Sequence, residues 1–205
     1  MDHFDEKIAI IGAGPAGLTA AFYLAETGYR PTVFEKSEHP GGMLRYGIPS
    51  YKLEKDLLDA EIDVAKAMGV EIKTGIEVGK DVTIQQLREQ GYKAFYIAIG
   101  CAAGRLPGLE NENAEGVMTA IDYLHDANCG NAPFAGKVVV VGGGNVAIDA
   151  SRVSARNAAS SVLQFSLEQE QDMPASVEEI KEAICKNIAD LIPKHITVED
   201  IIASI

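Results

Sequence analysis

The sequence predicts an α/β fold with parallel sheets, because one strand–turn–helix pattern occurs twice in its 205 residues. Residues 7–17 (KIAIIGAGPAG) and 137–147 (KVVVVGGGNVA) both begin with β-branched residues, break at glycines and continue into an alanine-rich stretch. Such unbroken apolar runs are typical of strands buried on both faces in a parallel sheet. Strand, glycine turn and helix open a βαβ unit, so two nucleotide-binding units are expected.

Strand-like and helix-like segments alternate around these repeats. Apolar residues recur at helical spacing from Leu53 to Met68, and Thr83 with Gln86 forms a capping box that opens a short helix. Further helices are expected over 16–26, 146–156 and 177–191 and from Thr197, and strands over 31–35, 70–74, 94–99 and 162–167. Loops are expected over 101–116 and 126–136.

Composition and charge exclude several classes of function. The 18 basic and 30 acidic residues give a formal charge of −12, which disfavours binding to nucleic acid through a basic surface. No apolar run approaches the ~20 residues of a membrane span, and no basic signal peptide opens the chain. We therefore expect a cytoplasmic protein that binds neither nucleic acid nor a membrane.

The reactive side chains form no catalytic or metal-binding cluster in the sequence. The three cysteines (Cys101, Cys129 and Cys185) contain no CxxC pair, and the four histidines are isolated. No GxSxG motif occurs. Hydrolytic chemistry and a metal site held by this chain therefore have no support, and no catalytic residue is assigned.

The first glycine turn has the spacing of a dinucleotide site. Gly12 permits the tight turn, Gly14 lets the backbone approach a pyrophosphate, and Gly17 lets the helix pack closely on the strand. Glu35 ends a second strand 35 − 12 = 23 residues later, where a carboxylate can accept both hydroxyls of a ribose. The alternative is a tight turn of purely structural importance, which the surrounding pattern favours less.

The second turn carries the same pattern with alanine at its third small position, which the motif allows. We assign Gly142, Gly144, Asn145 and Val146 to it. Glu168 follows 168 − 142 = 26 residues after the first glycine, and a carboxylate there favours NAD because it repels the 2′-phosphate of NADP. The alternative is that Glu168 is a solvated acid in a Glu- and Gln-rich loop.

A longer signature reaches from Glu35-Lys36 through residues 40–49 (PGGMLRYGIP) to Lys52. It resembles the flavin-binding signature of the small subunit of glutamate synthase and of the related module of dihydropyrimidine dehydrogenase. The similarity continues through residues 98–100 (AIG), 115–117 (EGV), 142–149 and 173–175 (MPA), and covers about residues 7–183.

This resemblance implies two Rossmann-like, doubly wound domains of ββα type. It implies an FAD domain over 1–115 and a nicotinamide domain over 116–205 with a helical C-terminal tail. The implied activity is hydride transfer between NAD(P)H and FAD, with electrons passing to a partner subunit. The FAD-binding positions that it implies are Gly12, Gly14, Pro15, Ala16, Gly17, Glu35, Lys36, Gly42, Leu44, Arg45, Gly47, Ile48, Lys52, Val78, Ala98, Ile99 and Gly100. For Arg45 and Lys52 the alternative is a solvated surface cation.

Three departures from the family pattern shape these expectations. Leu167 and Glu168 stand where the family has an arginine pair suited to a 2′-phosphate, so NAD is expected over NADP. The cysteine-rich iron–sulfur region and a later Gly-Asp return motif are not found. We therefore expect two incomplete domains and a partner that carries an iron–sulfur centre or an amidotransferase.

Two other functions remain as alternatives. The first is a non-catalytic nucleotide-binding or assembly module left by truncation of such an enzyme. The second, a disulfide reductase of the thioredoxin-reductase kind, is set aside because its chemistry needs a CxxC pair.

Overall fold

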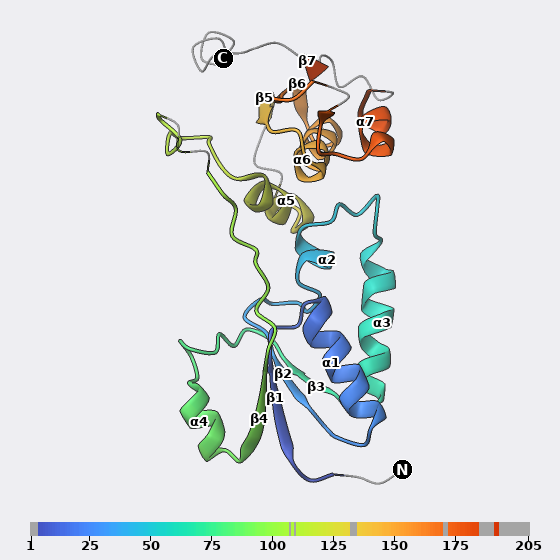
Figure 1. Ribbon diagram of the computed structural model, residues 1–205, viewed down its shortest axis with the longest axis vertical. Helices are drawn as coiled ribbons and strands as arrows, with labels where there is room; N and C mark the ends of the chain where they lie inside the picture. Colours follow the sequence, from blue (N-terminus) through green and yellow to red (C-terminus); the bar gives the residue numbers. More distant parts are fainter. Residues whose placement is uncertain are drawn as a thin grey trace. The chain divides into compact units, whose positions relative to one another are not determined.

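The computed structural model describes residues 4–106, 108, 110–131, 135–169, 172–184 and 191–192. The chain divides into two compact units, Met1–Ala102 and Ala103–Ile205 (Figure 1). Every strand pairing within the two units is parallel, which confirms the predicted α/β class. In the described part of the chain, no helix has the length and apolar character needed to cross a bilayer.

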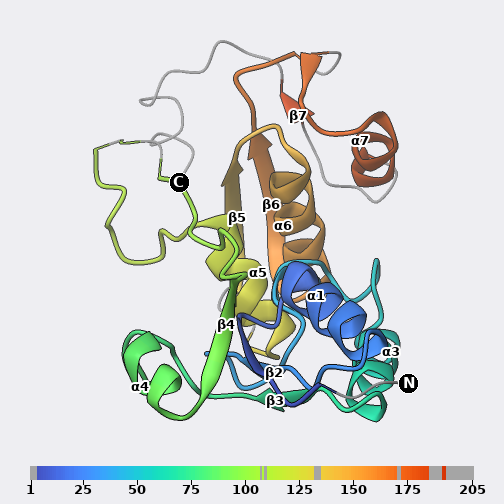
Figure 2. The ribbon, with the colours of Figure 1, turned by 60° about the horizontal axis from the view of Figure 1, so that its bottom comes forward.

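The first unit contains β1 (Lys7–Ile11), α1 (Pro15–Glu26), β2 (Thr32–Phe34), α2 (Met43–Tyr46), α3 (Lys55–Ala67), β3 (Glu71–Lys73), α4 (Ile84–Glu89) and β4 (Tyr92–Ile97). Its sheet has the order β3-β2-β1-β4, with α1 and α3 on one face and α4 on the other (Figures 1 and 2). The strand order places β1 between β2 and β4, which explains why β1 is apolar along most of its length.

Alternate residues of β1 supply the two halves of this core. Ile10 packs with Val33 and Ala21 in the cluster beneath α1 and α3. Its neighbours Ala9 and Ile11 point the other way, into the cluster formed with Leu87 of α4. The period of two along a strand therefore accounts for both layers.

The second unit contains α5 (Ala120–Asn128), β5 (Gly136–Val141), α6 (Asn145–Arg156), β6 (Ala159–Phe165), α7 (Val177–Ile184) and β7 (Leu191–Ile192), and its sheet has the order β5-β6-β7. Helix α6 runs along β5 and β6 (Figure 2). Its Ile148 is fully buried in a cluster with Leu124 of α5, Val162 of β6 and Ile180 of α7. Helix α6 is therefore the centre of this core.

An arginine lies almost completely inside this unit. Arg152 of α6 is 2% exposed, and its guanidinium donates to Glu179 at 2.7 Å and to Glu182. Because burial of an unpaired charge is costly, these two carboxylates of α7 are required partners. The ion pairs thus attach α7 to α6.

Several elements differ from the sequence-based expectation. Of the helix expected over 177–191, the structure describes Val177–Ile184 as α7, whereas Leu191–Ile192 is a strand that pairs with β6. The expected loop 126–136 begins inside α5, which starts at Ala120 after the N-cap residue Thr119, whose side chain accepts from the Asp122 N–H. Helix α2 was not expected. The capping box of Thr83 and Gln86 is confirmed, and the helix expected from Thr197 lies outside the described residues.

Candidate functional site

The first glycine turn lies at the carboxyl ends of β1, β2 and β4, the edge where parallel α/β sheets bind ligands. Gly12 has φ +105°, and a Cβ there would lie 2.4 Å from the Ala98 carbonyl oxygen. A Cβ on Gly17 would lie 1.9 Å from the Gly12 carbonyl oxygen. Two of the three motif glycines are therefore required by backbone packing within the protein itself.

The third motif glycine faces a second loop. A Cβ on Gly42, which has φ +53°, would lie 2.8 Å from the Gly14 Cα. Beside this approach, the Gly41 N–H donates to the Ala13 carbonyl at 2.8 Å. Main-chain contacts thus join the first turn to Gly41 and Gly42, at the start of the 42–48 segment that the resemblance assigned to the same cofactor.

Glu35 lies directly after β2 and is 7% exposed. Its carboxylate accepts from the Ala13 N–H at 2.7 Å and from the Ser37 N–H at 2.9 Å. Each carboxylate oxygen can accept a further hydrogen bond, so Glu35 can hold these N–H groups and still accept from the hydroxyls of a ribose. In this structure Glu35 fixes the glycine turn, a contribution that the expected ribose contact did not include.

Helix α3 holds the segment that contains Gly42, Leu44, Gly47 and Ile48. The Lys55 ammonium donates to the Leu44 carbonyl at 2.9 Å and to the Ile48 carbonyl at 2.6 Å. Burial, and secondly the nearby Arg45 guanidinium, lower the pKa of Lys55 below its usual value. Lys55 was not among the residues singled out from the sequence, and only its contact across the fold identifies it.

Arg45 is the second tie in this segment. Its Nε donates to the Pro40 carbonyl at 2.6 Å, and its Nη2 pairs with Asp59 of α3. The alternative interpretation of Arg45 as a solvated surface cation is therefore wrong. Lys36 and Lys52, in contrast, are exposed.

The second glycine turn is braced by a buried glutamine. Gln164 of β6 donates from Nε2 to the Gly142 carbonyl at 2.9 Å and accepts from the Ser151 hydroxyl at 2.7 Å. The Gly142 N–H in turn donates to the Phe165 carbonyl at 2.7 Å. A polar residue that interrupts the apolar pattern of β6 thus connects the turn, the strand and α6.

Ser166 and Glu168 lie against this turn. The Ser166 hydroxyl donates to Glu168 Oε2 at 2.5 Å. This bond, followed by the bond from its own backbone N–H, lowers the pKa of Glu168, so the carboxylate stays charged to a lower pH than an ordinary glutamate. A Cβ on Gly143 would lie 2.4 Å from Ser166 Oγ and 3.0 Å from Glu168 Oε2. The predicted carboxylate and the predicted turn are therefore adjacent.

The segment before α7 closes the other side of the turn. The Ala175 N–H donates to the Gly143 carbonyl at 3.0 Å, and the Ser176 N–H donates to Asn145 Oδ1 at 2.9 Å. Asn145 and Val146 stand exposed in the first turn of α6. The Asn145 side chain, assigned to a cofactor from the sequence, is here bonded to the protein's own backbone.

Comparison with known proteins agrees with this geometry. Residues 6–194 match the family described as pyridine nucleotide-disulphide oxidoreductase. The chain belongs to this family. Pyridine nucleotide-disulphide oxidoreductases bind FAD and use NAD(P)H, so the two glycine turns lie in a fold built for dinucleotides.

Three curated relatives cover most of the chain. It is 44% identical over 187 residues to the NADP(+)-dependent formate dehydrogenase subunit beta of Moorella thermoacetica, covering 89% of this chain and 26% of the relative. It is 37% identical to the glutamate synthase [NADPH] small chain of Escherichia coli, and the match covers 87% of this chain and 40% of the relative. It is 38% identical to the NAD-dependent dihydropyrimidine dehydrogenase subunit PreT of Escherichia coli O157:H7, and the match covers 86% of this chain and 43% of the relative. The resemblance inferred from the sequence is confirmed.

Among solved structures, a His57Gln mutant of FprA from Mycobacterium tuberculosis matches with a TM-score of 0.75 at 19% identity. The match covers 89% of this chain and 48% of FprA. At that identity it supports the pyridine nucleotide-disulphide oxidoreductase fold alone.

Other predicted residues of this family member are less closely gathered. Ala98 contacts the first turn, but Ile99 beside it is 72% exposed. Val78 forms a bridge with Val82 and packs on the α4 side of the sheet. Lys36 and Lys52 are exposed and Val78 lies on the α4 side, so the FAD-binding roles of these three residues stay predictions.

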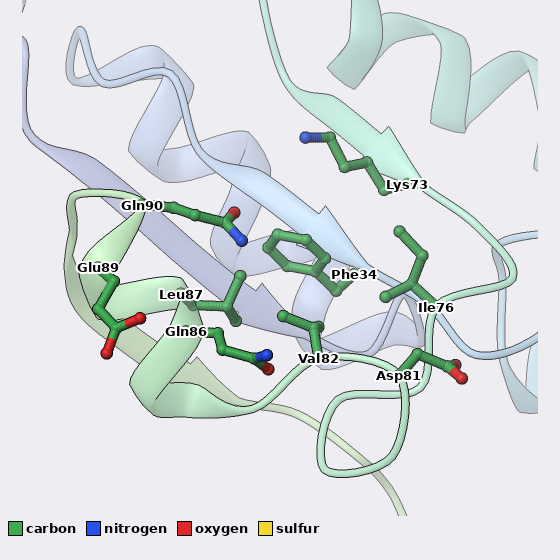
Figure 3. A pocket seen from close by; sticks show the side chains of 9 residues that line it. All are labelled: Phe34, Lys73, Ile76, Asp81, Val82, Gln86, Leu87, Glu89 and Gln90. Atoms are coloured by element: carbon green, nitrogen blue, oxygen red, sulfur yellow. The ribbon is translucent and has the colours of Figure 1, made fainter.

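Figure 3 shows a pocket on the α4 side of the sheet in the first unit. It is lined by Phe34, Lys73, Ile76, Asp81, Val82, Gln86, Leu87, Glu89 and Gln90. None of these residues belongs to the predicted cofactor-binding set, so this pocket is distinct from the site predicted at the first glycine turn. Within the described ranges, no group of three or more His, Cys, Asp or Glu side chains could hold a metal ion.

Replacing Lys55 by methionine is expected to lower the free energy of unfolding by about 1 kcal/mol, because two carbonyls of the 44–48 segment lose their donor. The matched control is Lys66→Met on the same helix, where Lys66 is exposed and pairs with the exposed Asp63 at 2.8 Å. That change is expected to stay within about 0.5 kcal/mol. Urea unfolding of both variants measures the difference, and equal losses would contradict the bracing role of Lys55.

Proposed function

We propose that the chain is a flavoprotein oxidoreductase subunit in which the first unit binds FAD and the second binds NAD(H). The observation that carries this proposal is the repeated pairing of a glycine turn with a carboxylate. Glu35 lies on the first turn, and Glu168 lies over Gly143 of the second. Transfer between two coenzymes requires a binding site for each, and each of these pairs has the pattern of a dinucleotide site.

The residues of the first turn fit an FAD diphosphate. At Gly12 and Gly17 an added Cβ would clash with backbone, so the turn can exist only in its tight, side-chain-free form. The N-terminal end of α1 adds the positive end of a helix dipole, which favours an anion. Gly42, seated against Gly14, extends this bare backbone surface toward the 42–48 segment, where a flat ring system can approach closely.

The second turn supports NAD as the nicotinamide coenzyme. Glu168 places a negative charge beside the turn, and the residues around it (FSLEQ, 165–169) include no cation to pair with a 2′-phosphate. Leu167, the neighbouring position, is 98% exposed and apolar. Relatives are named both for NADP(+) and for NAD, so their names leave this choice to the residues of the site.

Electron transfer between the two coenzymes requires little of the protein beyond placing their reactive rings together. FAD, when bound, accepts an electron pair from the reduced nicotinamide, and this exchange needs no acid or base from the chain. The residues identified here bind and orient: Glu35 and Glu168 at the riboses, and Lys55 and Arg45 behind the 42–48 segment. We further propose that electrons leave to a partner polypeptide with an iron–sulfur centre or an amidotransferase, since the relatives are named as subunits or small chains.

An anaerobic titration of the purified full chain, with any polypeptide that copurifies, tests this function. We expect flavin absorbance that is bleached by NADH at a lower concentration than by NADPH. A colourless protein whose melting temperature still rises with NADH would instead favour the non-catalytic nucleotide-binding module. A colourless protein with no response to either nucleotide would contradict both functions.

A further inference from the structure

Ser166 is bonded twice to the residue that the proposed function places at the nicotinamide coenzyme. Its hydroxyl donates to Glu168 Oε2 at 2.5 Å and accepts from the Glu168 backbone N–H at 3.2 Å. Both side chains lie over Gly143, at 2.4 and 3.0 Å from the place a Cβ would take. Ser166 therefore fixes the direction of an otherwise exposed carboxylate.

We propose that Ser166 is a positioning residue that determines coenzyme specificity, because it holds the Glu168 carboxylate over the second glycine turn where the ribose hydroxyls of NAD arrive. This inference rests on the proposed function. Ser166 does not itself need to touch the coenzyme, since its hydroxyl is engaged by Glu168 on both sides.

The physical reason is the conformational freedom of glutamate. A glutamate side chain in water samples many rotamers and loses that freedom when it binds a ligand. A carboxylate already fixed by Ser166 has lost it before the coenzyme arrives, so binding is tighter. Glu168 Oε1 and the remaining lone pairs of Oε2 stay available as acceptors for hydroxyls. A carboxylate fixed beside the turn also stays close to an incoming 2′-phosphate, so its repulsion is stronger than that of a carboxylate free to turn away.

The glycine turn is held in place independently of Ser166. The Gly143 carbonyl accepts from the Ala175 N–H, and Gln164 binds the Gly142 carbonyl. Removal of the Ser166 hydroxyl should therefore release Glu168 and leave the turn unchanged. Because the turn keeps its structure, the loss of affinity is expected mainly for NADH, whose ribose hydroxyls the Glu168 carboxylate is proposed to accept.

A double-mutant cycle on the full chain tests the inference, with dissociation constants for NADH and NADPH measured by fluorescence titration. Ser166→Ala is expected to weaken NADH binding by about 3- to 10-fold, the value of one hydrogen bond, with a smaller change for NADPH. Ser166→Thr keeps the hydroxyl and should restore NADH binding. In the Glu168→Gln background, Ser166→Ala should add little, because the two residues act as one unit. Ser161→Ala, at an exposed serine of β6, the strand that directly precedes Ser166, is the matched control.

The outcomes separate the inference from the function on which it rests. If Glu168→Gln leaves the ratio of NADH to NADPH affinity unchanged, the proposed role of Glu168 is wrong. If Glu168→Gln changes that ratio but Ser166→Ala does not, the function stands and the positioning role of Ser166 is overturned. Equal weakening of both nucleotides by Ser166→Ala also overturns it, since that pattern indicates a distorted turn.

Discussion

Replacing Gly12 by alanine is expected to lower the free energy of unfolding by about 2–5 kcal/mol and to abolish retention of FAD. The φ of +105° costs an L-residue about 1–2 kcal/mol. The new methyl group would also meet the Ala98 carbonyl at 2.4 Å, and overpacking of this kind costs about 1–3 kcal/mol more. Urea unfolding and the flavin absorbance of the purified protein measure the two effects.

Gly69 provides the matched control for this change. It has a similar φ of +98°, but the nearest atom to an added Cβ is Arg30 Cγ at 3.9 Å. Gly69→Ala should therefore show only the conformational cost of about 1–2 kcal/mol and keep its flavin. If both variants lose the same stability and the same flavin, the close approach of Gly12 to Ala98 has no importance of its own.

The second large effect is expected for Glu35→Ala. The change leaves the Ala13 and Ser37 N–H groups without their acceptor, and the first of these bonds is buried. A buried donor that loses its partner costs about 1–3 kcal/mol, so a total loss of about 2–4 kcal/mol is expected. FAD affinity should fall by more than about 10-fold, because the turn and the ribose acceptor are lost together. Chemical unfolding and flavin titration of the apoprotein measure these losses.

Glu71→Ala is the control for the loss of a carboxylate in the same sheet. Glu71 accepts from the Thr32 hydroxyl at 3.1 Å and pairs with Lys73 at 3.4 Å, at an exposed position. Such surface interactions contribute about 0–1 kcal/mol, and no effect on flavin is expected. A Glu35 variant that behaves like the Glu71 variant would show that Glu35 does not organise the turn.

The parts of the fold that local patterns encode could be predicted from the sequence. The two strand–glycine–helix repeats, the periodic apolar face of α3 and the capping box at Thr83 depend on residues close together in the chain. The same holds for the spacing between each glycine turn and its carboxylate. The sheet order and the attachment of Gly42 to Gly14 depend on distant contacts, although the family resemblance assigned both loops to one cofactor.

The elements and residues that were missed depend on tertiary packing. Residues 191–192 form a strand because β6 offers them a pairing edge, whereas a short apolar run by itself fits a helix equally well. Lys55 is one of two lysines in α3, and Gln164 interrupts the apolar pattern of β6, so neither stands out in the sequence. Their importance follows from carbonyl groups that only the folded chain brings within reach.

The contact between Ala13–Gly14 and Gly41–Gly42 has a mechanical consequence. Because it consists of main chain on both sides, neither stretch can shift by a side-chain rotation, and movement of one must carry the other. A diphosphate settling on the first stretch would therefore displace or immobilise the second directly, without a hinge between them. A shift at the proposed diphosphate site would then be passed directly to the 42–48 segment, where the flat ring system is proposed to lie.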